Sequence, residues 1–275
     1  MNGEIAQVVA LTSHANSFLR GNPIAIFFPD NSTCKYCDEI YFVEAINLNS
    51  DKWEEGEIIA LTPDEWFNYI GSKDSIGIRI SRHPQGKDDW ENVGFVGQGG
   101  IWEMESVREN ETSSFWRPKW ISSNERGLKN GGWKVIYGRV KESDTLSLKQ
   151  KSIDSLTKVF LDSLREIYDF AIDIKVEDFY IHNFRKAIQL LEGKSLESEL
   201  DYIHKDLCPK TICSDEILNI LEACQYAYVF GGMGTWNDPY TEVKVDPEEY
   251  RRVSKNLFSA LMEMIVAATN VTFYT

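Results

Sequence analysis

The spacing of apolar residues changes near the middle of the chain, and this change constrains the fold more than any other feature. Up to Val140, short segments alternate apolar and polar residues, as half-buried strands do. Beyond Leu148, apolar residues recur about every 3.6 residues, as on one face of a helix. The sequence therefore predicts an α+β protein, with an N-terminal β-rich antiparallel lobe and a C-terminal helical lobe of about four helices.

The β-rich lobe is expected to contain about eight short strands. The candidate segments, nine in all, are Ile5–Leu11, Pro23–Phe28, Glu39–Leu48, Glu57–Leu61, Ser75–Ile80, two strands within Val93–Val107 joined by a turn at Gln98–Gly100, Phe115–Ile121 and Trp133–Tyr137. One short helix interrupts them. Thr62 suits its N-cap, Pro63 its first position and Glu65 the reciprocal capping position, and Gly71 would end it.

The helical lobe is expected to contain four amphipathic helices. Their apolar stripes run over Ile153–Ala171, Val176–Leu191, Ile217–Tyr228 and Tyr250–Ala268. The last helix has the clearest start, with Asp246 as the cap and Pro247 in the first helical position. We place the boundary between Val140 and Thr145, which gives a β-rich domain of residues 1–142 and a helical domain of residues 143–275.

Composition places the chain among soluble globular proteins. It has 275 residues, enough for sizeable cores, and its 34 aromatic side chains (8 Trp, 12 Tyr and 14 Phe) need burial or a partner. No run approaches the roughly 20 apolar residues that span a bilayer. The first residues lack the basic start and apolar block of a signal peptide. We expect a cytoplasmic protein with no membrane partner.

Both halves of the chain are acidic. The formal net charge is -14; residues up to Val140 carry 14 basic and 20 acidic side chains, and the remainder carries 15 and 23. This balance argues against nucleic acid as a partner, because phosphate binding needs Lys and Arg. It fits either a solubilising surface or the attraction of a basic partner.

A glycine-rich segment connects the last two predicted helices. Gly231, Gly232 and Gly234 allow positive φ and close approach of the backbone, and are expected to form a hinge. After them come Trp236 and the polar pair Asn237–Asp238. In one interpretation Gly231 ends the third helix, Trp236 packs the hinge onto the last helix, and Asp238 forms a turn with Pro239. In the other, Trp236, Asn237 and Asp238 contact a partner.

The same segment carries a family resemblance. The stretch Phe230-Gly-Gly-Met-Gly-Thr-Trp-Asn-Asp238 is followed by a Tyr250-x-x-Val-Ser-x-x-Leu helix that ends in Ala267-Ala-Thr-Asn270. Together they resemble bacterial proteins encoded beside polymorphic toxins, which are suspected immunity proteins. Thr235 stands where that pattern has Ser, and the resemblance covers roughly the last 50 residues. It implies a cytoplasmic, acidic protein that binds and blocks a toxin domain.

The five cysteines, in a chain without a secretory signal, are expected to be reduced thiols. They are Cys34, Cys37, Cys208, Cys213 and Cys224. A redox role for the Cys34–Cys37 pair is disfavoured by its acidic neighbours, which raise thiol pKa values. A zinc site that combines Cys34 and Cys37 with Cys208 and Cys213 has loose ligand spacing. We expect two incidental thiols at the first pair and no metal.

No catalytic signature is evident. Gly97–Gly100 lacks the further glycine and the helix of a dinucleotide fingerprint, and no nucleophile elbow occurs. His182 lies within a predicted helix, one turn after Asp178, and is expected to be structural. Most acidic pairs suit helix starts or solvated faces. Asp88 and Asp89 are nevertheless candidates for charges that steer a basic partner.

Two functions remain open at this level. The first is an immunity-type binding protein that neutralises a toxin domain, possibly a basic nuclease, by tight non-covalent binding without a cofactor. Its candidate contacts are Trp236, Asn237 and Asp238, with Asp88 and Asp89 as steering charges. The alternative is an enzyme or small-ligand-binding protein with a site between the two lobes, lined for example by His182, Asp178 and the Asp238 turn.

Overall fold

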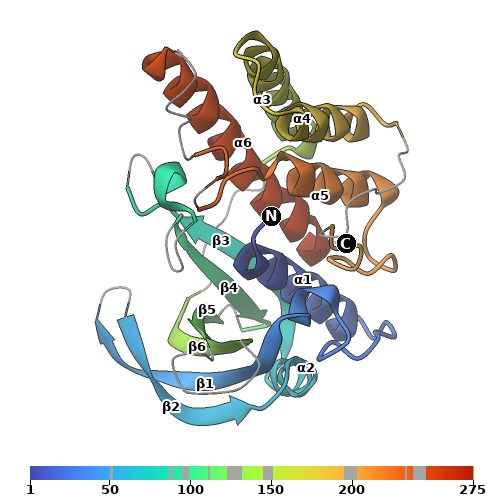
Figure 1. Ribbon diagram of the computed structural model, residues 1–275. Helices are drawn as coiled ribbons and strands as arrows, with labels where there is room; N and C mark the ends of the chain where they lie inside the picture. Colours follow the sequence, from blue (N-terminus) through green and yellow to red (C-terminus); the bar gives the residue numbers. More distant parts are fainter. Residues whose placement is uncertain are drawn as a thin grey trace.

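The computed structural model is an α+β protein in which a six-stranded sheet is followed by four helices (Figure 1). It describes residues 1–49, 52–86, 89–94, 99–110, 112–122, 132–144, 151–194, 203–232, 234–237 and 246–274. The helices are α1 (Gly3–Leu19), α2 (Pro63–Ser72), α3 (Ile153–Asp173), α4 (Asp178–Leu191), α5 (Asp215–Ala227) and α6 (Pro247–Tyr274), with short 3₁₀ helices η1 (Ser32–Cys34) and η2 (Asp89–Asn92). The strands are β1 (Cys37–Asn49), β2 (Lys52–Ala60), β3 (Ser75–His83), β4 (Ile101–Arg108), β5 (Thr112–Ser122) and β6 (Trp133–Asp144).

The sheet is mixed, not antiparallel throughout as expected. Its strand order is β2-β1-β6-β5-β4-β3, and β1 and β6 pair in parallel while the other neighbours are antiparallel. Parallel neighbours need a long crossover connection. Here the chain makes β2, α2, β3, β4 and β5 before it returns beside β1. Because this pairing depends on residues far apart in the chain, strand periodicity alone did not reveal it.

The segment Ile5–Leu11 is helical, and the expected strand there is wrong. It belongs to α1, whose N-cap Asn2 accepts a hydrogen bond from the Ile5 backbone N–H at 3.0 Å. Residues from Ile5 to Ser17 are all buried, including Gln7 and Asn16. A helix buried on every side has no polar face, so its apolar residues follow no helical period. The strand expected at Pro23–Phe28 is also absent, and those residues have no regular structure.

The other sequence signals for helices and strands are largely confirmed. The Thr62 side chain accepts from Glu65 N, and α2 ends at Ser72, one residue past the expected Gly71. Asp246 Oδ1 accepts from Glu248 N at the start of α6. No strand precedes Gly99 among the described residues of the segment expected to form a hairpin: η2 and a turn at Val93–Gly94 lie there, while residues 95–98 are outside the described residues.

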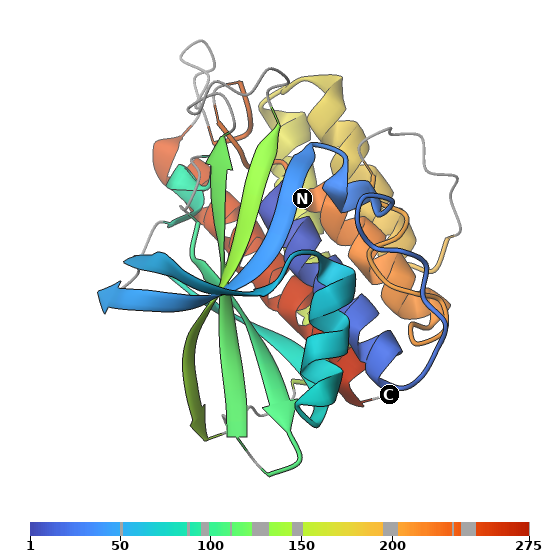
Figure 2. The same ribbon diagram turned by 90° about the horizontal axis from the view of Figure 1, so that it is seen from below.

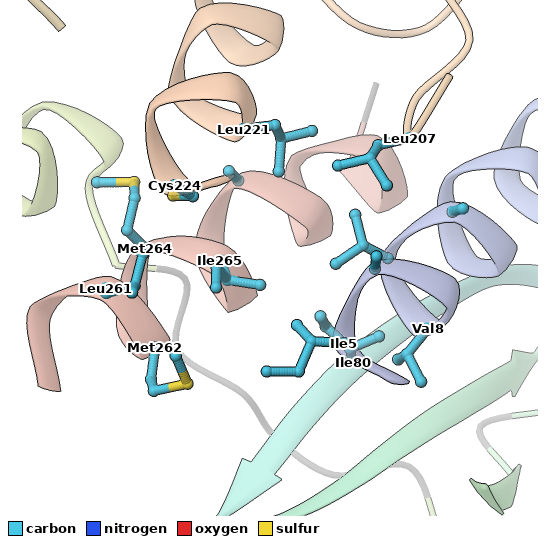
Figure 3. Packing of buried hydrophobic residues seen from close by; sticks show 14 of the residues in the cluster. Ile5, Val8, Ile80, Leu207, Leu221, Cys224, Leu261, Met262, Met264 and Ile265 are labelled. Atoms are coloured by element: carbon cyan, nitrogen blue, oxygen red, sulfur yellow. The ribbon is translucent and has the colours of Figure 1, made fainter. Parts of the chain in front are cut away.

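The two halves of the chain share one hydrophobic core. A single cluster of buried side chains contains residues of α1 and β3 together with residues of α5 and α6. Figure 3 shows Ile5 and Val8 of α1 beside Ile80 of β3, with Ile265 of α6 close by. Viewed from below, α1 and α6 lie between the sheet and the outer helices (Figure 2). The predicted boundary after residue 142 thus separates two segments that bury apolar surface against each other.

One edge of the sheet is closed by side chains instead of a strand. The Asn16 amide of α1 donates to Ile78 O at 2.7 Å and accepts from Ile78 N at 2.6 Å. The Asn270 amide of α6 does the same for Ile80, at 2.9 and 2.7 Å. An asparagine amide offers a donor and an acceptor side by side, as a neighbouring strand would. The outer backbone groups of β3 at Ile78 and Ile80 are therefore paired.

The face of the sheet turned away from α1 holds a smaller apolar cluster. Its buried members are Tyr41, Val43, Trp53, Phe115, Ile136 and Val140. The Trp53 ring lies over Gly138 so closely that a Cβ there would come within 2.8 Å of it. Trp53 thus fastens β2 to β6, across the intervening β1. Beside this cluster, the buried Arg79–Glu105 and Arg117–Glu103 ion pairs, both at 2.7 Å, join β3, β4 and β5.

The helix α6 is long and apolar enough, over its 28 residues, to meet a length and hydropathy criterion for crossing a membrane. Core helices of soluble proteins meet the same criterion. Half of its most apolar window is buried inside the protein. Its buried side chains, such as Leu257, Leu261 and Ile265, belong to the shared core.

Candidate functional site

The glycine segment after α5 is shaped by a close contact with the loop after η2. A Cβ on Gly94 would overlap the peptide that joins Gly231 to Gly232. Gly234 is the described glycine of this segment with a positive φ, +77°. Gly232 has neither feature, because the nearest atom to a Cβ there is 3.9 Å away. The three positions therefore differ in their need for glycine. Gly231 allows close approach of the backbone, Gly234 adopts a left-handed conformation, and nothing in the surroundings of Gly232 requires glycine.

Trp236 is a core residue. Its side chain is 4% exposed and stacks on Tyr250 of α6, with ring centroids 5.7 Å apart. Tyr180 and Phe184 of α4 meet it edge-on at 5.4 Å. Its indole N–H donates to Ser254 Oγ at 2.8 Å. These contacts fit the structural interpretation, in which Trp236 packs onto the last helix, and this burial leaves little of the ring accessible to a partner.

Asn237 ties its own loop to η2. Its Oδ1 accepts from Gly231 N at 2.7 Å, and its Nδ2 donates to Glu91 O at 3.0 Å and to Trp90 O at 3.4 Å. All of these bonds are internal. The amide that was expected to face a partner therefore hydrogen-bonds backbone groups of the protein itself. Gly231 does not end α5, which stops at Ala227.

Asp89, one of the two charges expected to steer a partner, is mostly buried in an ion pair. Asp89 pairs with Arg82, and both side chains are about one-tenth exposed. The Arg82 guanidinium also donates to Gly99 O at 2.9 Å. This ion pair holds the start of η2 against β3. Because the two charges compensate each other, the pair contributes little electrostatic potential at the surface. Asp88 and Asp238 lie outside the described residues.

The cysteines are unsuited to redox or zinc chemistry. Burial raises the pKa of the Cys34 thiol to about 12 and that of Cys37 to about 11, so neither forms the thiolate that reacts. Cys208 and Cys213 form a disulfide, with Cα atoms 6.3 Å apart, where reduced thiols were expected. Two bonded sulfurs are not thiolate ligands, which removes the four-cysteine zinc site. No group of three or more potential ligands exists among the described His, Cys, Asp and Glu residues.

A serine, a histidine and an aspartate meet at η1, although far apart in sequence. Ser32 Oγ donates to Asp206 and is 2.8 Å from His204 Nδ1; Ser32 N also donates to Asp206 Oδ2 at 2.7 Å. In a catalytic triad the carboxylate binds the imidazole, which faces the nucleophile. Here the carboxylate binds the serine hydroxyl and its backbone amide. This geometry anchors the start of η1 to residues 203–206, and no carboxylate of the described residues hydrogen-bonds the imidazole of His204.

A cleft of about 610 Å³ opens between the sheet and the helical half. It is lined by the start of α1, by η1, by the tryptophans Trp120 and Trp133, by His204 and by the glycine segment at Gly231–Gly232. A site between the halves was the expectation of the alternative function, but with other residues. His182 and Asp178 lie on α4 and do not line this cleft.

A second candidate surface is the β1–β2 hairpin. Residues 37–60 contain seven acidic side chains and one lysine. The hairpin projects away from the helices (Figures 1 and 2), and β2 has a neighbouring strand on one side only. Ile46, Leu48 and Ile58 are each about half-exposed on it. Exposed apolar side chains among acidic ones are the pattern of a protein-binding surface.

Part of the hairpin's charge is compensated and part is not. Glu44 pairs with Arg139, and Lys134 lies 4.0 Å from both Glu39 and Glu55. Glu57 is exposed, and no hydrogen bond or ion pair joins it to another described residue. From the sequence alone, most acidic pairs suit helix starts or solvated faces, and this hairpin is not distinguished. The sequence feature that could have indicated this surface is the high density of acidic residues around the isoleucines of residues 37–60.

Comparisons with known proteins add no relative: no family model, no curated protein and no solved structure matches this chain.

Proposed function

We propose that the protein is a cytoplasmic binding protein of the immunity type, which neutralises a basic toxin domain by tight non-covalent binding. The resemblance of its last 50 or so residues motivates the class. The observation that carries the proposal is the β1–β2 hairpin, where exposed Ile46, Leu48 and Ile58 stand among unneutralised carboxylates. The buried Trp236 and Asn237 support the scaffold and take no part in the contact.

The hairpin suits a basic partner for two physical reasons. Its carboxylates, added to a net charge of -14, attract a basic protein and speed its association. Its apolar side chains supply the water-excluded centre that a stable complex needs. A toxin that acts on nucleic acid carries such a basic surface, since it must bind phosphates. The hairpin would cover that surface and exclude the substrate.

The arrangement of potential nucleophiles favours binding over catalysis. The Ser32 hydroxyl is held by Asp206, and burial keeps the thiols of Cys34 and Cys37 protonated. A protein that acts by covering an active site needs a shaped surface and no reacting group.

The test starts with the toxin domain encoded next to this gene. Co-expression should rescue growth, and the two proteins should co-purify as a complex that salt weakens. The informative variant is the double substitution Glu54→Lys and Glu57→Lys, which should weaken the complex at least about tenfold, or about 1.4 kcal/mol. The matched control is Asp162→Lys with Asp169→Lys on α3, which changes the net charge equally on exposed positions away from the hairpin.

Three results would count against the proposal. One is the lack of binding to the neighbouring gene product. Another is rescue without a complex, which would point to an enzymatic or indirect effect. The third is equal weakening by the two double substitutions, which would show that overall charge matters and the hairpin does not.

A further inference from the structure

Glu4 places a carboxyl group in the aromatic cleft without a partner. It lies in the first turn of α1, and no hydrogen bond or ion pair joins it to another described residue. Burial raises its pKa to about 7. No nearby cation contributes to this shift, which has desolvation as its cause. The cleft thus contains an acidic group that no hydrogen bond or ion pair from the described residues neutralises.

The walls around Glu4 are aromatic. The indoles of Trp120 and Trp133 meet edge-on with centroids 5.9 Å apart, and Phe230 and the exposed Tyr36 also line the cleft. The Trp120 ring reaches the start of α1, where a Cβ on Gly3 would be 3.8 Å from it. Its indole N–H is buried without an acceptor among the described groups. The volume, about 610 Å³, falls within the usual range for small-molecule sites.

The cationic groups near the cleft are otherwise engaged. Lys35 is exposed and lies over the Tyr36 ring, 5.3 Å from its centroid. The Met1 amino group donates to Gln225 O at 3.4 Å, and burial lowers its pKa to about 5. Burial also lowers the pKa of His204. At neutral pH, neither the Met1 amino group nor His204 supplies the charge that would complement an ionised Glu4.

We propose that this cleft is a binding site for a compact organic cation of the substituted ammonium class. The indole and phenyl faces attract a cation through their negative π surfaces, and the Glu4 carboxylate supplies the opposite charge. A quaternary ammonium group fits this combination best, because it needs no hydrogen-bond acceptor and its methyl groups pack against rings. This site is independent of the hairpin and of the partner proposed for it.

Binding should be coupled to proton release. Where Glu4 is protonated, the cation displaces its proton to solvent, and the carboxylate–cation pair replaces the neutral acid. Affinity should therefore rise from about pH 6 to about pH 8, as the carboxyl ionises without a ligand. Of the other titratable groups near Glu4, the buried tyrosines, Cys37 and the Met1 amino group keep their protonation in this range. Tyr137 and Tyr228 have raised pKa values, as does Cys37 at about 11, while the pKa values of His204 and the Met1 amino group are lowered.

The experiment uses the full-length protein and choline, whose charge does not change with pH. Tetramethylammonium is a second probe, and 3,3-dimethylbutan-1-ol is the neutral analogue of choline. Calorimetry and tryptophan fluorescence should detect saturable choline binding with a Kd on the order of 1 mM or tighter. The neutral alcohol should bind at least about tenfold more weakly. Calorimetry in buffers of different ionisation enthalpy should reveal proton release near pH 6.

Two variants locate the site. Glu4→Gln keeps the shape of the side chain and should lower choline affinity at least about tenfold, with loss of the pH dependence. Asp162→Asn on α3 removes one exposed charge elsewhere and should change neither. If Glu4→Gln does not fold, the pH dependence of choline affinity in the unmodified protein still tests the proposal. No saturable binding, equal binding of the alcohol, unchanged affinity in Glu4→Gln, or a flat profile between pH 6 and 8 would each overturn the proposal.

Discussion

The two edges of the sheet differ in how their backbone groups are treated. At β3, the side chains of Asn16 and Asn270 take the place of a neighbouring strand, and α1 and α6 cover that edge. At β2, the edge is bordered by carboxylates and half-exposed isoleucines, and it carries no further strand. An unprotected edge is a liability that proteins manage by closure or by charge. This chain uses closure on one side and charge on the other, and charge leaves a surface that a complementary partner can occupy.

The largest expected effect comes from opening the closed edge. Asn16→Leu preserves the approximate side-chain size but leaves Ile78 N and O without partners in the core. Each unpaired buried group costs about 1–3 kcal/mol, so the free energy of unfolding should fall by about 3 kcal/mol. Urea unfolding measures this directly. Asn68→Leu, at an exposed position of α2, should change it by less than about 0.5 kcal/mol. Equal effects of the two substitutions would refute the closure.

A smaller loss is expected where the loop after η2 meets the glycine segment. Gly94→Ala places a methyl group against the Gly231–Gly232 peptide, and backbone on both sides leaves little room to adjust. We expect a loss of about 2 kcal/mol in the free energy of unfolding. Gly232→Ala faces open space and serves as the control, with a change near zero. If Gly232→Ala were the more damaging of the two, the assignment of the close contact would be wrong.

The contact between Trp53 of β2 and Gly138 of β6, which attaches the β1–β2 hairpin to the rest of the sheet, can be tested by substitution. Gly138→Ala would press a methyl group into the Trp53 ring, which a Cβ would approach to 2.8 Å. A loss of about 1–2 kcal/mol should follow, with faster hydrogen exchange of the β2 amides. The penalty should shrink when the ring is already absent, so the cycle with Trp53→Leu measures the contact. Additive effects of the two substitutions would show that the ring does not hold β2 to β6.

The sequence predicted features that depend on neighbouring residues and missed those that depend on distant ones. The start of α6 was read correctly because Asp246 and Pro247 act within one helical turn. The edge closure escaped notice because Asn16 and Ile78 are 62 positions apart, and Asn270 and Ile80 are 190 apart. A buried asparagine and a solvated one look alike in a sequence, and only the backbone opposite the amide distinguishes them.

The candidate surfaces follow the same rule. Trp236 was a candidate for a partner contact as well as for packing onto the last helix, and Tyr180, Phe184 and Tyr250 enclose it from two helices. Glu4 was not among the predicted site residues, since nothing within its own segment shows that it will line the same cleft as Trp120 and Trp133. Only part of the hairpin surface could be predicted from the sequence. Its acids are local in sequence, but the exposure of its isoleucines follows from the strand order.

The smallest expected effect on stability belongs to the hairpin's free carboxylates, and this makes them informative. Glu57 has no described partner and Glu54 accepts one exposed hydrogen bond, from Asn47 Nδ2 at 2.7 Å. Replacing both by Lys should therefore change the free energy of unfolding by less than about 0.5 kcal/mol. Urea unfolding of this variant beside Asn16→Leu would compare the two edges directly. A large loss would mean that the carboxylates stabilise the fold, and the hairpin would then resemble the closed edge. A neutral result would show that the fold does not require the carboxylates of Glu54 and Glu57, which is what a surface kept for a basic partner predicts.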